Sequence, residues 1–225
     1  TSVTGIYFNY RNSIASQEIF RQAIDLAVDR SLLAKGTDVY KPAFQFLASH
    51  FWGRIPELNN HNPAEARKLL AKVHGLDLSK TYKIPVFNSF FDDPKLGKYI
   101  SLLNKQLSEA GLKVEFFDSK DKFLSPSDSD TLFKIISLGA DVTDPVVLFG
   151  LMRGKSPLAP HYPPKDAEYE NLYTIAESAT SLDAKVLALK SLSQYVYDHH
   201  FVVPLFERRS LFGINPQRVK DVGKQ

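Results

Sequence analysis

Two spacings of apolar residues alternate along this chain, one typical of helices and the other typical of strands. Apolar residues from Ile19 to Val28 recur every three or four positions, which predicts a helix over about residues 16–30. Residues 4–10, TGIYFNY, are rich in β-prone aromatic residues and predict a strand before that helix. The same criteria predict further helices at about 30–36, 62–75, 96–110, 145–152, 169–178 and 182–198, and further strands at 82–88, 113–117, 133–138, 201–206 and 210–214.

Capping residues mark the ends of several predicted helices. Asn62 is a good N-cap, Pro63 suits the first helical position, and Gly75 is suited to close the helix. Ser181 is placed to cap the last predicted helix in the same way. Residues 37–60 hold two prolines and the single tryptophan without a clean period, and we predict a long connection there.

The alternation of helices and strands indicates the fold class. A sheet whose faces are covered by helices is the natural way to bury both kinds of element. We therefore predict an α/β (α+β) fold with a mixed β-sheet covered by helices. No internal repeat and no linker is visible, so residues 1–225 are expected to form a single unit.

Composition narrows the possible functions. Hydrophobic residues make up 44% and aromatic residues 12% of the chain, which is enough for a folded core. The net charge is only +3 and basic residues are spread along the chain, which argues against nucleic-acid binding. The absence of cysteine excludes disulfides and thiolate metal sites. With neither an apolar run of membrane-spanning length nor a signal peptide, the chain is expected to be cytosolic, processed or excised from a longer protein.

No group of residues indicates catalysis. The pair His199 and His200 predicts a polar helix end rather than a metal site, because adjacent helical residues do not share a face. The sequence has no GxSxG motif, no Gly-rich phosphate loop and no HExxH motif. We therefore expect that the protein is not an enzyme and uses no cofactor and no metal.

The most informative polar segment is residues 137–145, SLGADVTDP, where an apolar strand ends in small residues and carboxylates. Ligand sites of α/β folds lie at strand ends of this kind. Asp144 directly precedes Pro145, which is the pattern of a helix cap. For Asp141 two interpretations stay open: a contact with an ammonium group of a ligand, or stabilisation of the turn.

Five short stretches follow one another in a recognisable order. They are GIYFNY (5–10) with IFRQAIDLAVDR (19–30), NPAEARKLL (62–70) with a Gly-Leu pair at 75–76, LLNKQLSEAGLKV (102–114), GADVTDP (139–145) and VVPLF (202–206). Together they resemble family 5 of the bacterial extracellular solute-binding proteins, which includes the dipeptide- and oligopeptide-binding proteins of ABC importers. Each stretch alone is a weak signal, and the order of all five makes the resemblance strong.

The resemblance implies one lobe of a two-lobed periplasmic-binding-protein type II fold that closes on its ligand. Family members are about twice as long, so the partner lobe is expected to lie outside residues 1–225, with both termini of this lobe at the hinge. The implied function is the substrate-binding component of an ABC transporter, which binds a peptide or a related small solute for import. The implied partner is a membrane permease. A monomer without nucleic-acid contact is expected, periplasmic or extracellular and tethered to the membrane.

The resemblance also assigns ligand-binding residues. Asp141 falls where oligopeptide-binding members place the acid that pairs with the amino terminus of the peptide. Ser137, Leu138 and Gly139 fall where the strand backbone pairs with the peptide in β fashion. Arg208 falls near a ligand-facing position, with a solvated cation as the alternative. In the family a tryptophan stands at the position of Leu138, so an aromatic wall of the pocket is lost here.

Two other functions stay open on the sequence. The same pair of lobes forms the ligand-sensing part of certain cytosolic transcription regulators, behind a DNA-binding domain, and nothing in these residues separates the two. A stand-alone enzyme is a third hypothesis. It lacks support because no nucleophile, acid–base pair or metal set has suitable spacing.

Overall fold

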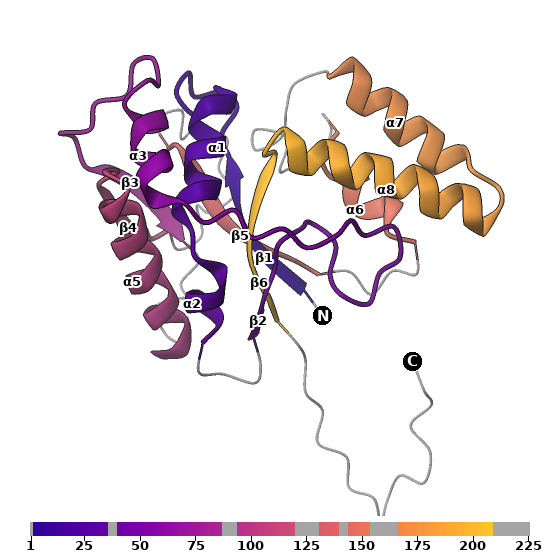
Figure 1. Ribbon diagram of the computed structural model, residues 1–225, viewed down its shortest axis with the longest axis horizontal. Coiled ribbons are helices and arrows are strands. Elements are labelled where there is room, and N and C mark those ends of the chain that lie inside the picture. The colour runs from indigo at the N-terminus through magenta and orange to yellow at the C-terminus, as the bar shows by residue number, and fades with distance from the viewer. Residues whose placement is uncertain are drawn as a thin grey trace, which may run out of the picture.

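The computed structural model describes residues 2–35, 40–86, 94–119, 131–139, 144–153 and 166–208 (Figure 1). The strands in these residues are β1 (Ser2–Phe8), β2 (Tyr40–Pro42), β3 (Tyr82–Val86), β4 (Val114–Asp118), β5 (Phe133–Gly139) and β6 (Val202–Arg208). The helices are α1 (Glu18–Ala27), α2 (Arg30–Ala34), α3 (Pro63–Leu70), α5 (Pro94–Glu109), α6 (Val146–Gly150), α7 (Ala167–Ser178) and α8 (Leu182–Asp198).

A four-stranded sheet stands at the centre of the molecule, in the order β2-β6-β1-β5. Its neighbouring strands all pair antiparallel. A second sheet consists of β3 and β4, which pair in parallel. The predicted α/β class is confirmed, with one refinement: among the described strands, the parallel and antiparallel pairings fall in two separate sheets.

Helices cover both faces of the central sheet (Figure 1). On one face α1, α2, α3 and α5 pack together with the β3–β4 pair, and their apolar side chains meet Ile6 and Phe8 of β1 in a first core. On the other face α6, α7 and α8 pack with residues 43–51, and their side chains meet Val3 and Tyr7 in a second core. Because successive side chains of a strand point to opposite faces, β1 serves both cores at once.

A β-bulge in β6 allows the central sheet to accommodate a proline. The pairing of β1 with β6 shifts register between Thr4 and Gly5, so that Leu205 is the extra residue. Pro204 lies directly beside this shift and cannot donate a backbone hydrogen bond, which is why prolines inside sheets are found at bulges. Its carbonyl oxygen accepts instead from Nε of Arg30 at 2.7 Å.

Most predicted elements are confirmed, with boundaries that move by a few residues. The side chain of Asn62 accepts from the amide of Glu65 at 3.1 Å, and that of Ser181 accepts from the amide of Ala184 at 3.3 Å, so both predicted N-caps are present. α3 ends at Leu70, several residues earlier than predicted, and turns lead from there to Gly75, whose φ is +77°.

The long connection predicted over residues 37–60 holds one short strand that the sequence pattern did not reveal. Tyr40 to Pro42 form the edge strand β2, which is held by pairing with β6. The ring of Tyr40 packs edge-on against Phe206 and Tyr99, each at 4.9 Å between centroids. The predicted strand at 210–214 lies outside the described residues.

A buried charged cluster joins the two halves of the molecule. The carboxylate of Asp25 on α1 forms an ion pair with Arg30 on α2, and its second oxygen lies 3.3 Å from Nδ1 of His200. His200 lies two residues after the end of α8 and has a positive φ of 49°. His199 likewise faces the carboxylate of Glu18 at 3.0 Å. The histidine pair thus forms a polar helix end that fastens α8 to α1.

No helix in the described part of the chain is both long enough and apolar enough to cross a lipid bilayer.

Candidate functional site

The exposed end of β5 is the part of the sheet that carries the predicted ligand contacts. β5 is the last strand of the central sheet: β3 lies close to it, but no described strand pairs with its outer edge. Its first residues are buried, and its last three, Ser137, Leu138 and Gly139, reach the surface. An exposed strand edge of this kind presents a row of backbone donors and acceptors to a ligand.

The hydrogen-bond phase of β5 decides which residues face that free edge. The amide of Asn9 donates to the carbonyl of its register partner Leu132 at 2.9 Å. Hydrogen-bonded and non-hydrogen-bonded pairs alternate along an antiparallel ladder, so Leu138 points its backbone groups toward Val3 of β1. Ser137 and Gly139 therefore point their amides and carbonyls away from β1, toward the free edge.

Gly139 and Arg208 flank the first residue of β1. Both pair in register with Ser2, Gly139 from β5 and Arg208 from β6. Since neighbouring strands lie about 4.8 Å apart, the two Cα atoms are about 10 Å from each other. The structure thus brings two predicted site residues from distant parts of the sequence to the same end of the sheet.

Hydroxyl groups surround this end of the sheet. Thr4 pairs in register with Ser137, and their side-chain oxygens form a hydrogen bond of 2.6 Å. Ser2 lies on the same face of β1 as Thr4, because residues two apart in a strand share a face. Sequence reasoning missed Ser2 and Thr4. Their spacing was a usable signal, but only the pairing with β5 places them beside the site.

Leu138 lies on the opposite face from Ser137 and Gly139. Its side chain is half-buried and packs against the second core. The structure therefore separates the three consecutive residues: two of them offer backbone groups to the free edge, and Leu138 anchors the strand between them.

Of the acidic turn that follows β5, Asp144 is described and Asp141 lies outside the described residues. Oδ1 of Asp144 accepts from the amide of Val146 at 3.1 Å, at the start of α6. The other oxygen forms an ion pair with Lys185 of α8. These contacts agree with the predicted capping role of Asp144.

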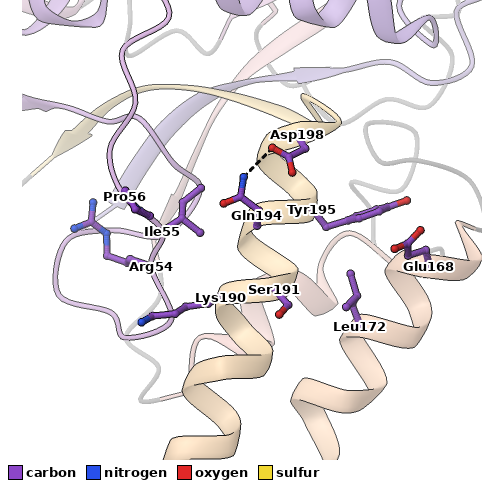
Figure 2. A pocket seen from close by; sticks show the side chains of 10 residues that line it. All are labelled: Arg54, Ile55, Pro56, Glu168, Leu172, Lys190, Ser191, Gln194, Tyr195 and Asp198. Carbon is purple, nitrogen blue, oxygen red and sulfur yellow. Dashed lines mark hydrogen bonds between the residues drawn. The ribbon is translucent and has the colours of Figure 1, made fainter.

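A separate hollow of about 710 Å³ lies between residues 54–56, α7 and α8 (Figure 2). Its floor is the exposed face of α8, its walls come from residues 54–56 and from α7, and none of the predicted ligand-binding residues lines it. At one end Tyr195 bonds both carboxylate oxygens of Asp166 at 3.0 Å. Burial and this hydrogen bond raise the pKa of Tyr195 to about 12, which keeps the phenol protonated. The hollow shows no paired acid and base.

Metal ligands do not gather anywhere in the described residues: no three side chains of His, Asp or Glu converge there. His199 and His200 point to different carboxylates, of Glu18 and of Asp25. Each histidine is thus engaged in joining α8 to α1.

Comparison with known proteins gives a family match over most of the chain. Residues 1–159 match the model of the bacterial extracellular solute-binding proteins, family 5 Middle. No curated protein gave a significant match to the sequence.

Solved structures agree with this fold. The ABC transporter substrate-binding protein CtaP of Listeria monocytogenes aligns with a TM-score of 0.77 at 19% identity, over 92% of this chain and 43% of its own. NikA of Staphylococcus aureus, solved with Ni(L-His)2, gives 0.78 at 16% identity, over 91% and 44%. The oligopeptide-binding protein AppA of Bacillus subtilis, solved with a nonapeptide, gives 0.72 at 16% identity, over 92% and 45%.

The family match and the structural matches agree on the same kind of protein. The chain spans less than half the length of each of these solved proteins. At these identities the structural matches establish the shared type II binding-protein fold, and the family model adds the lineage. The chain belongs to family 5 of the bacterial extracellular solute-binding proteins.

Proposed function

We propose that this chain is one ligand-binding lobe of a solute-binding protein that delivers a peptide, or a related small solute, to an ABC importer. In this proposal residues 1–225 form a single lobe, and a partner lobe encloses the ligand from the other side. The complete protein works outside the cytoplasm, as a monomer tethered to the membrane, and docks on a permease after hinge closure. The observation that carries the proposal is the free edge of β5 at the exposed end of the sheet.

Backbone pairing is the contact that this edge offers. Ser137 and Gly139 direct amides and carbonyls to the open side, and an extended peptide can add there as one more strand. Gly139 has no side chain, which allows the ligand backbone to approach closely. Binding of this kind depends little on the side chains of the ligand, so it suits a carrier that accepts many peptides.

A charge contact would fix the direction of the peptide. Asp141 follows Gly139 by two residues, and the family resemblance assigns it to the ammonium group of the ligand. A carboxylate that pairs with an ammonium group in a closed, water-poor cleft makes a short charge-assisted hydrogen bond. This role selects ligands with a free amino terminus.

The solved relatives support a peptide as the ligand and also show that related proteins bind other solutes. B. subtilis AppA was solved with a nonapeptide, and S. aureus NikA was solved with Ni(L-His)2. The departure at Leu138, where the family has tryptophan, removes an aromatic side chain from the strand end. In the proposed mode of binding, backbone and charge contacts therefore hold the ligand, rather than a side-chain pocket.

The Asp141→Asn variant tests the ammonium contact in the full-length protein. Loss of one member of a desolvated charge pair costs about 2–5 kcal/mol, so affinity for trialanine should fall at least about thirtyfold. Calorimetry at pH 7 measures this change. N-acetyl-trialanine, which lacks the ammonium group, should bind the wild type and the variant equally.

Asp144→Asn is the matched control, because Asp144 is an acid of the same turn that caps α6 and pairs with Lys185. It should lower the free energy of unfolding and leave trialanine affinity unchanged. An Asp141→Asn variant that keeps trialanine affinity within a factor of two would refute the ammonium role.

A further inference from the structure

Arg208 is an unpaired cation at the ligand-binding end of the sheet. Its side chain is exposed, and it stands in register with Ser2 and, across β1, with Gly139. Among the arginines that the structure describes, it alone has a side chain that makes no hydrogen bond and no ion pair. The others have partners: Arg21 binds the carbonyl of His199, Arg30 pairs with Asp25, Arg54 with Glu57, Arg67 binds the carbonyl of Glu109, Arg153 pairs with Glu170, and Arg11 is also engaged.

The neighbouring carboxylate is turned away from Arg208. Glu207 precedes it in β6, so the two side chains point to opposite faces of the sheet. Glu207 is 4% exposed, and its two oxygens accept from the amide and the hydroxyl of Ser49 at 2.8 and 2.6 Å. Glu207 is thus engaged by Ser49, and no carboxylate in the described part of the chain pairs with the Arg208 guanidinium.

The face that Arg208 shares holds uncharged groups. Ser2 lies beside it, and Thr4 and Ser137 lie one row further in, with their hydroxyl groups bonded to each other. On its other side Tyr40 is the register partner of Arg208 and is buried against Phe206. Among the described residues, no carboxylate has to be displaced for an anion to reach this surface.

We propose that Arg208 is a specificity-determining residue that pairs with a carboxylate of the ligand. The inference rests on the proposed function, and it goes further by naming an anionic group as a selected feature of the solute. A guanidinium binds a carboxylate through two parallel N–H···O bonds, and this pairing gains strength when a cleft closes and excludes water. The carboxylate can be the carboxyl terminus of a peptide or an acidic side chain.

Amide-resolved NMR titration of the chain tests the pairing with three defined probes. Trialanine carries a terminal carboxylate, trialanine amide carries none, and Ala-Glu-Ala-amide carries only a side-chain carboxylate. We expect trialanine amide to bind about tenfold more weakly than the best carboxylate probe, the fold-change of one charge-assisted hydrogen bond. The two carboxylate probes distinguish the terminal from the side-chain source.

Variants connect the preference to Arg208. Arg208→Gln should abolish the difference between carboxylate and amide probes, and Arg208→Lys should keep part of it. The control Lys190→Gln removes an exposed cation of α8, at the hollow of Figure 2, and should leave the preference intact. A preference that survives Arg208→Gln would overturn the inference, as would equal binding of all three probes to the wild type.

The outcomes also separate this inference from the proposed function. Equal binding of the probes with shifts at Ser137 and Gly139 would keep the peptide-binding lobe and overturn the role of Arg208. If no peptide shifts any amide at 10 mM, peptide binding by this lobe fails, and succinate alone then decides the role of Arg208. Succinate-induced shifts at Ser2 and Arg208 that vanish in Arg208→Gln would support it, and their absence in the wild type would overturn it.

Discussion

Asp25 shows how strongly a single residue can depend on its partners. Its carboxylate is 4% exposed on α1, and it reaches Arg30 and His200 at once. Burial raises the pKa of the Asp25 carboxyl, but the Arg30 charge and the hydrogen bond and charge of His200 outweigh burial, so the net pKa lies below its usual value. The Asp25 carboxylate is therefore ionised and has partners for both oxygens in the folded state.

Replacement of Asp25 by Asn should destabilise the protein strongly at neutral pH. Removing one member of a buried pair leaves the other charge uncompensated, and we expect a loss of about 3 kcal/mol in the free energy of unfolding. Urea unfolding at pH 7 measures it. Asp198→Asn, which changes an exposed acid at the end of α8, should stay within about 0.5 kcal/mol of the wild type.

The same substitution should lose its effect in acid. A carboxyl whose folded pKa is lowered stabilises the fold above its unfolded pKa of about 3.9, and that contribution disappears as the pH falls through the folded value. The difference between wild type and Asp25→Asn should therefore be present at pH 5 and shrink below about pH 4. An equal difference at pH 7 and pH 2.5 would show that the carboxylate is not the stabilising group.

The sequence could not reveal this cluster at the residue level. Asp25 and Arg30 are close in the chain, but only the break between α1 and α2 turns them toward each other. His200 arrives from a distant helix, and Glu207 finds Ser49 across 158 positions. Local patterns predict which faces of helices and strands are buried, but they do not show which polar residues pair over long distances in the chain.

At the level of elements, α3 is a helix whose ends are determined by nearby residues of its own sequence. Asn62 accepts from the amide of Glu65, Pro63 occupies the first turn, and basic residues occupy the last turn. Each of these signals acts within a few residues, so the start of the helix was predictable from the sequence alone.

Asn62→Ala should cost about 1 kcal/mol of stability, because it leaves an amide at the start of α3 without its side-chain partner. Thermal or urea unfolding measures the change. Asn62→Asp, which keeps the accepting oxygen, should retain most of the stability. A loss of equal size in the Asp and Ala variants would refute capping as the cause.

The strand β2 shows the opposite case. Its three residues have no alternating pattern that stands out, and it exists because β6 offers an edge and because Tyr40 fits between Phe206 and Tyr99. The candidate site also has a part that the sequence predicts and a part that only the structure shows. Ser137, Gly139 and Arg208 could be named from family resemblance, whereas their common position around Ser2 needed the strand order.

At the scale of the whole molecule, the proposed function makes this chain one lobe, which offers one side of a cleft. The isolated chain should bind trialanine no more tightly than the millimolar range, because half of the contacts and all of the closure are missing. Calorimetry or NMR titration can measure this weak affinity, and the full-length protein should bind far more tightly. Micromolar binding by the isolated chain would contradict the single-lobe proposal.

The adjacency of Ser2 and Arg208 has a consequence for the architecture of the family. Ser2, at the start of β1, and Arg208, at the end of β6, are cross-strand neighbours. The two ends of the segment 2–208 therefore lie side by side. A module of this form can sit inside another domain as an insertion, joined by two closely spaced crossings that disturb the host little. By the same topology, a short peptide could join the two points, and new ends could be opened in the exposed turn between α7 and α8. The part of the chain between residues 2 and 208 is thus a unit suited to circular permutation and to transplantation between hosts.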